Sequence, residues 1–383
     1  MSELDVISQD FERDVWCLHG LPIDNLTADQ ALKKVSDCKP ADIPHVLSTV
    51  NLNWIALSTR DQDFRKSIVD SDICTIDGVP ILWLSKLFHS PMNEVVTGSG
   101  LIEKLYKQKT EEDKTTIYLF GGEENAGEIA ANRINQHADG LEAVGWHNPG
   151  FCSVEQMNEQ PHVESINAQS PDILLVALGA NKGQSWIEQN KATINAKVIS
   201  HLGATINFVA GSVKRAPRWM QRSGLEWSWR IMQEPKLFKR YFVDGLVVSK
   251  LAIGKLPSIV RYRKLHKKAR NIGSNFALEL VEMDNWQKIV IKGSYQTHNI
   301  QQIREVFKNA ALKKTDVELC FANVNFVDNQ FLGMMLVLIK HQKRACKMLH
   351  ITGVNKSIDQ IFRLNLLCKS LDSVGFRRWE RLE

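Results

Sequence analysis

Two kinds of hydrophobic pattern alternate along the first 210 residues. In residues 61–71, Phe64, Ile68 and Val69 recur at helical spacing, whereas residues 73–76 form a short unbroken apolar run that is typical of a buried strand. The same pattern predicts further helices at 29–36, after a cap at Thr27, and at about 125–136, and further strands at 45–50, 116–120, 172–178 and 197–199. This alternation predicts an α/β fold, namely a Rossmann-like domain with a parallel sheet and crossover helices.

A carboxylate follows directly on the strand at 73–76. Asp77 and Gly78 stand where that strand ends, and the carboxyl end of a strand in an open α/β sheet faces the crevice that binds ligands. An Asp-Gly pair is also a common turn, so this position alone leaves a binding role and a turn both open.

A second α/β pattern occupies the last 110 residues. It predicts strands at 276–283, 288–292, 317–321 and 348–352, and helices at 300–312, 331–343 and 356–366. Gly245, Gly254 and Pro257 are expected to break the segment before it, and the charged stretch 261–271 reads as a linker. We therefore divide the chain into an α/β core (1–210), a basic amphipathic appendage with linker (211–273) and a small α/β domain (274–383).

Composition narrows the class of protein. The chain has 383 residues, of which 44% are hydrophobic and 24% charged, as expected for an ordinary globular protein. It contains no stretch of 18 apolar residues, and its acidic start lacks the pattern of a signal peptide. The seven cysteines include no C-x-x-C pair, which favours neither a disulfide framework nor a zinc site. We expect a cytoplasmic protein.

Charge is distributed unevenly. Residues 214–270 contain 16 Lys and Arg but only three acids, interleaved with Trp, Tyr and Phe. Aromatic and basic residues side by side are typical of a helix at a membrane surface, so an anionic membrane is the favoured partner, with the protein peripheral on the inner face of the cell membrane. Two alternatives remain: ordinary core packing behind a solvated basic face, and nucleic acid binding. Nucleic acid binding is the least favoured of the three, so we expect no nucleic acid partner.

Small-residue turns follow several of the predicted strands. Gly121 and Gly122 follow the strand at 116–120, Gly179 follows the strand at 172–178, and Gly203 follows the strand at 197–199. Each turn can place backbone N–H groups and a helix N-terminus against a phosphate, and several on one sheet edge suit a nucleotide diphosphate. One such glycine turn is by itself usually only a tight turn, and the P-loop pattern is absent.

Six segments of the chain, in this order, resemble the signature of the WecG/TagA/CpsF glycosyltransferase family. The segments are 48–54, 96–99, 174–187, 210–220, 224–230 and 233–235. The resemblance extends over about residues 16–257. It implies an inverting glycosyltransferase that needs neither metal nor cofactor and moves a hexosyl or N-acetylhexosaminyl group from a UDP-sugar to a polyprenyl-diphosphate-linked sugar, in the synthesis of a surface polysaccharide.

The resemblance also implies roles for individual residues. Asp77 corresponds to the general base, and Thr49 and Asn51 to the polar pair beside it, although a strand-end Thr and a loop Asn are more often structural. Without a metal, arginines would stabilise the departing diphosphate. The candidate substrate-binding residues are Gly121, Gly122, Gly179, Lys182, Gln184, Gly203, Arg215, Arg218, Arg230 and Arg240.

Four positions depart from the family pattern. Val95 and Leu237 stand where the family has basic residues, Asn207 replaces an acid before the Phe of a late strand, and Gly183 replaces a Gln that follows here as Gln184. These changes keep open an alternative in which the chain is a catalytically impaired regulatory scaffold that senses a nucleotide sugar.

The C-terminal pattern, together with the segment 325–333, resembles a STAS domain. Such domains often carry a phosphorylatable Ser two residues after the Asp, but Gln330 occupies that position and Asn329 the one before it. No phosphorylation switch is expected at this site, and a constitutive protein partner remains open. The apolar run 334–339 is most simply core, with a docking face as the minority interpretation.

Overall fold

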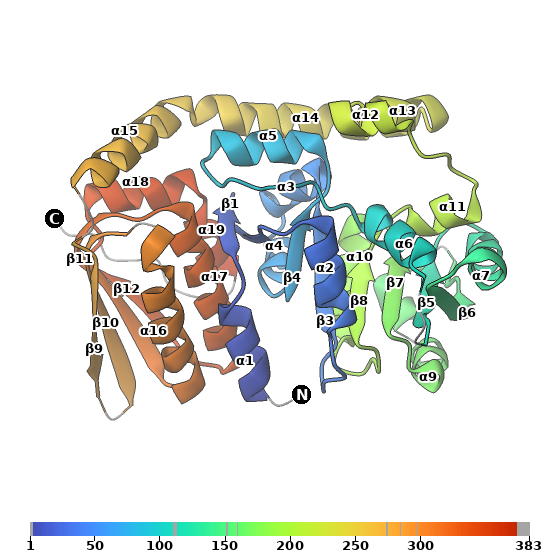
Figure 1. The fold of residues 1–383 in the computed structure, drawn as a ribbon, viewed down its shortest axis with the longest axis horizontal. Helices are drawn as coiled ribbons and strands as arrows, with labels where there is room; N and C mark the ends of the chain where they lie inside the picture. Colours follow the sequence, from blue (N-terminus) through green and yellow to red (C-terminus); the bar gives the residue numbers. More distant parts are fainter. Residues whose placement is uncertain are drawn as a thin grey trace.

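The structure is a computed structural model that describes residues 3–109, 113–150, 152–158, 160–272, 275–283, 285–295 and 297–373. Figure 1 shows two α/β units side by side and a row of helices running across one end of both.

Twelve strands are present in the described ranges. In chain order they are β1 (Val15–Leu18), β2 (Leu21–Asp24), β3 (His45–Val50), β4 (Ile73–Ile76), β5 (Thr115–Gly121), β6 (Leu141–His147), β7 (Ile173–Ala177), β8 (Val198–His201), β9 (Ala277–Glu282), β10 (Trp286–Ser294), β11 (Asp316–Phe326) and β12 (Leu349–Thr352).

The helices of the first unit follow in chain order. They are α1 (Glu3–Phe11), α2 (Ala28–Ser36), α3 (Leu52–Ser58), α4 (Gln62–Val69), α5 (Val79–Leu87), α6 (Gly98–Lys107), α7 (Ala126–His137), α8 (Val154–Met157), α9 (Gln160–Gln169), α10 (Ala180–Asn190) and α11 (Thr205–Ala210). The helices that follow are α12 (Arg218–Ser223), α13 (Glu226–Gln233), α14 (Leu237–Gly254), α15 (Leu256–Ile272), the 3₁₀ turn η1 (Thr297–Asn299), α16 (Ile300–Lys313), α17 (Asn329–Arg344), α18 (Lys356–Leu364) and α19 (Leu367–Ser373).

The first unit is built on a six-stranded parallel sheet. Its strand order is β4-β3-β8-β7-β5-β6, and every neighbouring pair is parallel. The chain leaves β3 toward β4 on one side, while β8, β7 and β5 lie on the other, so the order reverses beside β3. A reversal of this kind opens a crevice at the carboxyl ends of the strands. The predicted Rossmann-like parallel sheet is confirmed.

Helix starts in this unit follow recognisable caps. Thr27 closes a capping box with Gln30 at the start of α2, and the Asp61 side chain accepts the Phe64 N–H at the start of α4. Such caps satisfy N–H groups that the helix itself leaves unpaired. They fix where each helix begins and therefore where the preceding strand must end.

The C-terminal unit has a four-stranded mixed sheet of order β12-β11-β10-β9. The β9–β10 pair is antiparallel, and the β10–β11 and β11–β12 pairs are parallel. All four predicted strands and three predicted helices of this region are present, so the small α/β fold is confirmed. Helix α17 is buried along most of its length, and the run 334–339 is core as expected.

The two units share one hydrophobic core. Helix α17 packs against the β1–β2 hairpin of the first unit, and one cluster of buried side chains includes Phe11 and Leu18 together with Phe331 and Leu336. At Gly333 the contact leaves no room for a side chain, since a Cβ there would lie 2.1 Å from the Val15 carbonyl oxygen. The proposed division at residue 274 stays a prediction, but the C-terminal unit is not a loosely tethered appendage.

Buried charges cross the same contact. Lys340 of α17 lies 2.7 Å from Asp10 and 2.5 Å from Asp72, and Lys343 pairs with Asp70. Asp70 and Asp72 lie just after α4, and both carboxylates meet cations from the C-terminal unit.

From Arg218 onward the appendage consists of helices α12 to α15 joined by short turns. Gly245 lies inside α14, so the break predicted there is wrong, whereas the boundary at Gly254 and Pro257 is where α14 gives way to α15. The predicted linker 261–271 is also wrong, because it belongs to α15. Ile259, Tyr262 and Ala269 are buried on one side of α15, and this apolar stripe stabilises the charged stretch as a helix.

Candidate functional site

One large pocket opens at the carboxyl ends of the parallel strands. Its volume is about 1640 Å³, and it lies between the sheet edge, α5, α6 and the appendage helices α13 and α14. Single-ligand pockets usually measure roughly 300–1,000 Å³. The cavity therefore has room for two substrates side by side.

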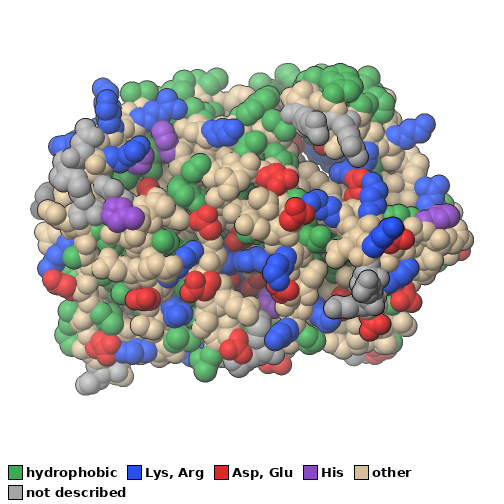
Figure 2. All heavy atoms as spheres, viewed as in Figure 1, with side chains coloured by type: hydrophobic (Ala, Val, Ile, Leu, Met, Phe, Trp, Pro, Cys, Tyr) green, Lys and Arg blue, Asp and Glu red, His purple; other side chains and the backbone are tan. Residues whose placement is uncertain are grey.

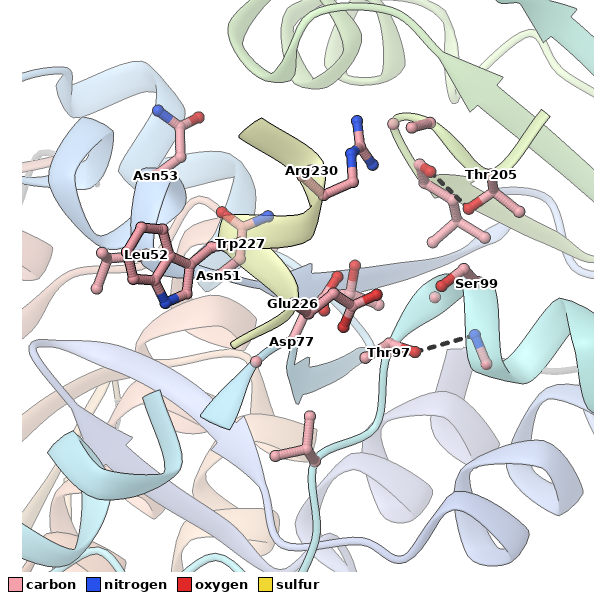
Figure 3. A pocket seen from close by; sticks show the side chains of 18 of the residues that line it. Asn51, Leu52, Asn53, Asp77, Thr97, Ser99, Thr205, Glu226, Trp227 and Arg230 are labelled. Carbon is pink, nitrogen blue, oxygen red and sulfur yellow. Dashed lines mark hydrogen bonds between the residues drawn. The ribbon is translucent and has the colours of Figure 1, made fainter. Parts of the chain in front are cut away.

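Asp77 lies in this pocket at the end of β4 (Figure 3). Its backbone N–H donates to the Val50 carbonyl oxygen at 2.7 Å, which ties the end of β4 to the end of β3. Burial, and next the negative charge of Glu226, raise the pKa of Asp77 to about 7, while Arg215 and Arg230 act in the opposite direction. A carboxyl group with that pKa can accept and return a proton near neutral pH.

Thr49 and Asn51 lie beside Asp77 and line the same pocket. Thr49 is 4% exposed near the end of β3. The Asn51 side-chain oxygen accepts the Trp54 N–H and so caps α3, while its amide nitrogen remains available to the pocket. The structure thus brings the three predicted catalytic residues together.

The N-terminus of α6 lines the pocket near Asp77, since the Val96 N–H just before this helix donates to the Ile76 carbonyl oxygen at 2.9 Å. Thr97 caps this ten-residue helix by accepting the Gly100 N–H at 2.9 Å. Arg215 donates to Ser99 at 3.0 Å and is ion-paired with Glu103. A helix N-terminus beside an arginine is a favourable place for an anion.

Three of the predicted glycine turns reach the pocket. Gly122, Gly179 and Gly203 line it, at the ends of β5, β7 and β8. Gly121 does not, and its backbone (φ 90°) has a structural reason to be glycine because a Cβ would lie 2.7 Å from the Ala177 carbonyl oxygen.

Lys182 and Gln184 also lie away from the pocket wall. The exposed Lys182 ammonium group donates to the Cys152 carbonyl oxygen at 3.0 Å, and Gln184 is buried beneath the sheet edge, 3.5 Å from the Ser48 hydroxyl. Helix α10 begins at Ala180, directly after the turn that follows β7. Lys182 and Gln184 therefore belong to the helix, and their side chains point away from the pocket.

Gly183 departs from the family pattern for a visible reason. A Cβ at this position would lie 2.1 Å from the imidazole of His201. The His201 ring in turn bonds to the Leu178 carbonyl oxygen at 2.5 Å, and burial lowers its pKa. A neutral histidine therefore occupies the space that a side chain at 183 would need and holds the turn after β7.

The appendage forms the remaining wall. Arg230 of α13 lies over the Phe208 ring, 5.1 Å from its centre, and pairs with Glu234 at 2.9 Å. Arg240 of α14 also lines the pocket. Arg218 begins α12, but its side chain lies outside the described residues. Asn207, expected before a late strand, lies instead in α11.

Several pocket residues had no predicted role. Glu226 and Trp227 of α13 lie close to Asp77 and Asn51 in Figure 3. Asn53 donates to the buried Asp244 of α14 at 2.9 Å, which fixes α14 over α3. Glu226 belongs to the Gly-Leu-Glu-Trp segment at 224–227, so its sequence signal was present, but no local pattern pointed to its partner.

The exposed surface of the appendage is both apolar and basic. Figure 2 shows hydrophobic side chains gathered along the end of the molecule where α12 to α15 lie in Figure 1. The most exposed apolar side chains on these helices are Trp219, Met232, Phe238, Phe242, Leu246, Ile253 and Val260, of which Phe238, Phe242 and Leu246 also line the pocket. Exposed bases accompany them at Lys236, Lys239, Lys250, Lys264 and Lys268. None of the described helices is both long enough and apolar enough to cross a bilayer.

Residues 16–258 match the family described as Glycosyl transferase WecG/TagA/CpsF family. The chain belongs to this glycosyltransferase family. It is therefore an enzyme of the glycosyltransferase class, and the resemblance noted in the sequence is confirmed for the first two thirds of the chain.

Curated relatives of this glycosyltransferase are distant but consistent. A protein of Bacillus subtilis (strain 168) is 26% identical over 227 residues, which cover 58% of this chain and 85% of the relative. A protein of Staphylococcus aureus (strain MRSA252) is 22% identical over 238 residues, covering 62% of this chain and 91% of the relative. Both are named N-acetylglucosaminyldiphosphoundecaprenol N-acetyl-beta-D-mannosaminyltransferase.

Proposed function

We propose that this enzyme transfers a sugar, with inversion and without a metal, from a UDP-sugar to a polyprenyl-diphosphate-linked sugar in the synthesis of a surface polysaccharide. The observation that carries this proposal is Asp77, a carboxyl group with a raised pKa in a pocket large enough for two substrates. The names of the curated relatives support an N-acetylhexosamine as the transferred sugar and an undecaprenyl-diphosphate-linked acceptor.

Asp77 is the proposed general base. It takes the proton from the acceptor hydroxyl while the acceptor oxygen bonds to the anomeric carbon, and the bond from that carbon to UDP breaks with its electron pair leaving on the diphosphate. Thr49 and Asn51 position the acceptor beside the carboxylate. One carboxylate is sufficient because the donor already carries a good leaving group.

The leaving diphosphate is assigned to the part of the wall formed by the start of α6 and the glycine turns. The N-terminus of α6 with Arg215 offers N–H groups and a cation, and Gly122, Gly179 and Gly203 allow the phosphates to approach the backbone closely. Arg230 and Arg240 from the appendage add positive charge to the pocket wall. Arg218 is retained as a candidate on the family resemblance alone.

The appendage is the proposed membrane-binding surface. Exposed aromatic and aliphatic side chains alternate with exposed lysines on α13 to α15, as in helices that lie in a lipid headgroup region. The same helices wall the pocket, so an acceptor anchored in the inner face of the cell membrane would enter the pocket without leaving the lipid surface. We propose in addition that the protein is cytoplasmic and peripheral on the inner face of the cell membrane.

The C-terminal domain is proposed to be STAS-like, and division of the chain near residues 210 and 274 is part of the same proposal. Its order of strands and helices supports the assignment. Gln330 is buried and bonds to Tyr295 at 3.1 Å and to Asp14 at 2.9 Å. Because this side chain is occupied in the contact between the units, the domain acts as a fixed part of the enzyme, and any protein partner would bind elsewhere on it.

Release of UDP tests the proposed function. The full chain would be incubated with a panel of UDP-sugars and undecaprenyl-diphosphate-linked N-acetylglucosamine, and both UDP and the lengthened lipid would be measured. We expect one UDP-N-acetylhexosamine to give both products in equal amounts. Binding of a UDP-sugar without any transfer would instead favour the regulatory scaffold.

A further inference from the structure

Glu226 brings a second carboxyl group to Asp77 from a distant part of the chain. Asp77 directly follows β4, whereas Glu226 begins α13 in the appendage. Figure 3 shows the two side chains next to one another in the pocket. The sequence separates them by almost 150 positions, so their meeting is a product of the tertiary fold.

Packing around the two residues holds them in this position. Gly224, two residues before Glu226, adopts a left-handed conformation (φ 76°) and packs on Val79, two residues after Asp77. A Cβ at Gly224 would lie only 3.0 Å from the Val79 Cβ and 3.5 Å from the Trp83 ring. The turn before α13 therefore rests directly on the turn after β4.

Glu226 is the charged residue that raises the pKa of Asp77, because the two arginines nearby are paired with other carboxylates. Arg215 and Arg230 also act on Asp77, but each already has a carboxylate partner, Glu103 for Arg215 and Glu234 for Arg230. Among the described residues, neither arginine forms an ion pair with Glu226. The negative charge of Glu226 is therefore left to act on Asp77, and together with burial it outweighs the two arginines in raising the pKa of Asp77.

We infer that Glu226 is a positioning residue of the reaction that acts through Asp77, supplying the negative charge that makes this carboxylate basic enough to take the acceptor proton. The inference rests on the proposed function. It also means that the base is complete only when α13 of the appendage is docked on the sheet edge. A general base gains proton affinity from such a neighbour and is most effective when its pKa lies near the working pH.

Titration of Asp77 itself tests the inference without substrate. In protein labelled with ¹³C at the aspartate carboxyl carbons, the Asp77 resonance is the one that disappears in Asp77→Asn. We expect its midpoint near pH 7 in the wild type, lower by about one pH unit in Glu226→Gln, and close to wild type in Glu226→Asp. Glu123→Gln is the matched control, since Glu123 lines the same pocket but does not act on Asp77, and it should leave the midpoint unchanged.

Kinetics supply the second readout. The acidic limb of the kcat/KM profile should move to lower pH in Glu226→Gln by the same amount as the resonance, with a lower plateau. An unmoved resonance in folded Glu226→Gln would overturn the inference even if sugar transfer is found. A moved resonance in a protein that transfers no sugar would overturn the proposed function and leave the coupling of the two carboxyl groups in place.

Discussion

The ammonium group of Lys340 lies 2.5 Å from the carboxylate of Asp72, although the two residues are 268 positions apart. Lys340 is 1% exposed and also contacts Asp10. Its charge therefore links α17 of the C-terminal unit to both α1 and the loop that enters β4. Because Asp77 directly follows β4, the C-terminal unit supports the strand that presents the proposed base.

Replacing Lys340 should destabilise the whole enzyme. Lys340→Met keeps much of the side-chain volume but leaves Asp10 and Asp72 without their shared cation, and breaking a buried ion pair on one side costs about 3–5 kcal/mol. Urea unfolding would measure the loss. Lys356→Met, at an exposed position on α18, is the control and should stay within about 0.5 kcal/mol of wild type. Equal stability of the two variants would contradict the role assigned to the network.

Acid unfolding should report the same network. Burial alone raises the pKa of Asp10 and of Asp72, but Lys340 with Arg13 at Asp10, and Lys340 with Arg344 at Asp72, hold both pKa values below the usual range. The stability they contribute is present above the unfolded-state pKa of about 3.9 and is lost as the pH falls through the lower folded-state values. We expect the wild type to unfold below about pH 4. Lys340→Met should unfold at a higher pH, as measured by circular dichroism during acid titration.

Strand positions could be predicted from the sequence because the hydrophobic pattern of a few neighbouring residues is enough to identify a buried strand. The strands at 45–50 and 73–76 were predicted to the residue, since each is a short run rich in β-branched and other apolar residues, with a proline or a polar residue on either side. Helix α15 was missed because its many charges hide the spacing of Ile259, Tyr262 and Ala269. A linker and a solvated helix with a narrow buried stripe have the same composition.

Some residues of the candidate site could be predicted from a local pattern, and others depend on contacts between distant elements. Asp77 could be found because a strand end fixes its direction, and the strand register then brings Thr49 and Asn51 beside it. Glu226 and the cations that meet Asp70 and Asp72 could not be found, because each depends on a contact between elements far apart in the chain. Lys182 and Gln184 were misplaced because α10 begins at Ala180 and turns both side chains away from the pocket.

Two helical glycines should respond in opposite ways to alanine. Gly333 of α17 faces the Val15 carbonyl oxygen with no room for a Cβ, whereas a Cβ at Gly245 of α14 meets nothing within 4 Å. Gly333→Ala should force α17 off the β1–β2 hairpin and lower the melting temperature, with overpacking of this kind costing about 1–3 kcal/mol or more. Gly245→Ala should raise the stability by about 0.5–1 kcal/mol, because alanine is the better helix former. A neutral Gly333→Ala variant would show that the two units can move apart freely.

Charge reversal on the appendage should weaken membrane binding. Lys236, Lys239 and Lys250 are exposed beside the apolar side chains of α14, and each basic residue near an anionic surface contributes about 1 kcal/mol. Their combined change to Glu should release the protein from liposomes that contain phosphatidylglycerol, and added salt should do the same to the wild type. Reversal of Lys33, Lys313 and Lys356, which lie outside the appendage, is the control with equal change in net charge. If the protein sediments with liposomes to the same extent in high salt and after the appendage reversals, the proposed membrane surface is contradicted.

Asp77→Asn separates the proposed base from a mere turn residue. The amide keeps the shape of the carboxyl group but cannot accept the acceptor proton, so transfer should fall by about 10²- to 10⁴-fold while the fold and UDP binding are kept. The pH dependence of the melting temperature is an independent test. Because the pKa of Asp77 is raised to about 7, its ionisation in the folded state opposes folding increasingly as the pH rises from the unfolded value of about 3.9 through 7. The Asn variant should therefore melt at a higher temperature than the wild type at pH 8 and at nearly the same temperature at pH 4. A variant that turns over normally would remove Asp77 from the mechanism, and one that is less stable at both pH values would assign it to the turn between β4 and α5.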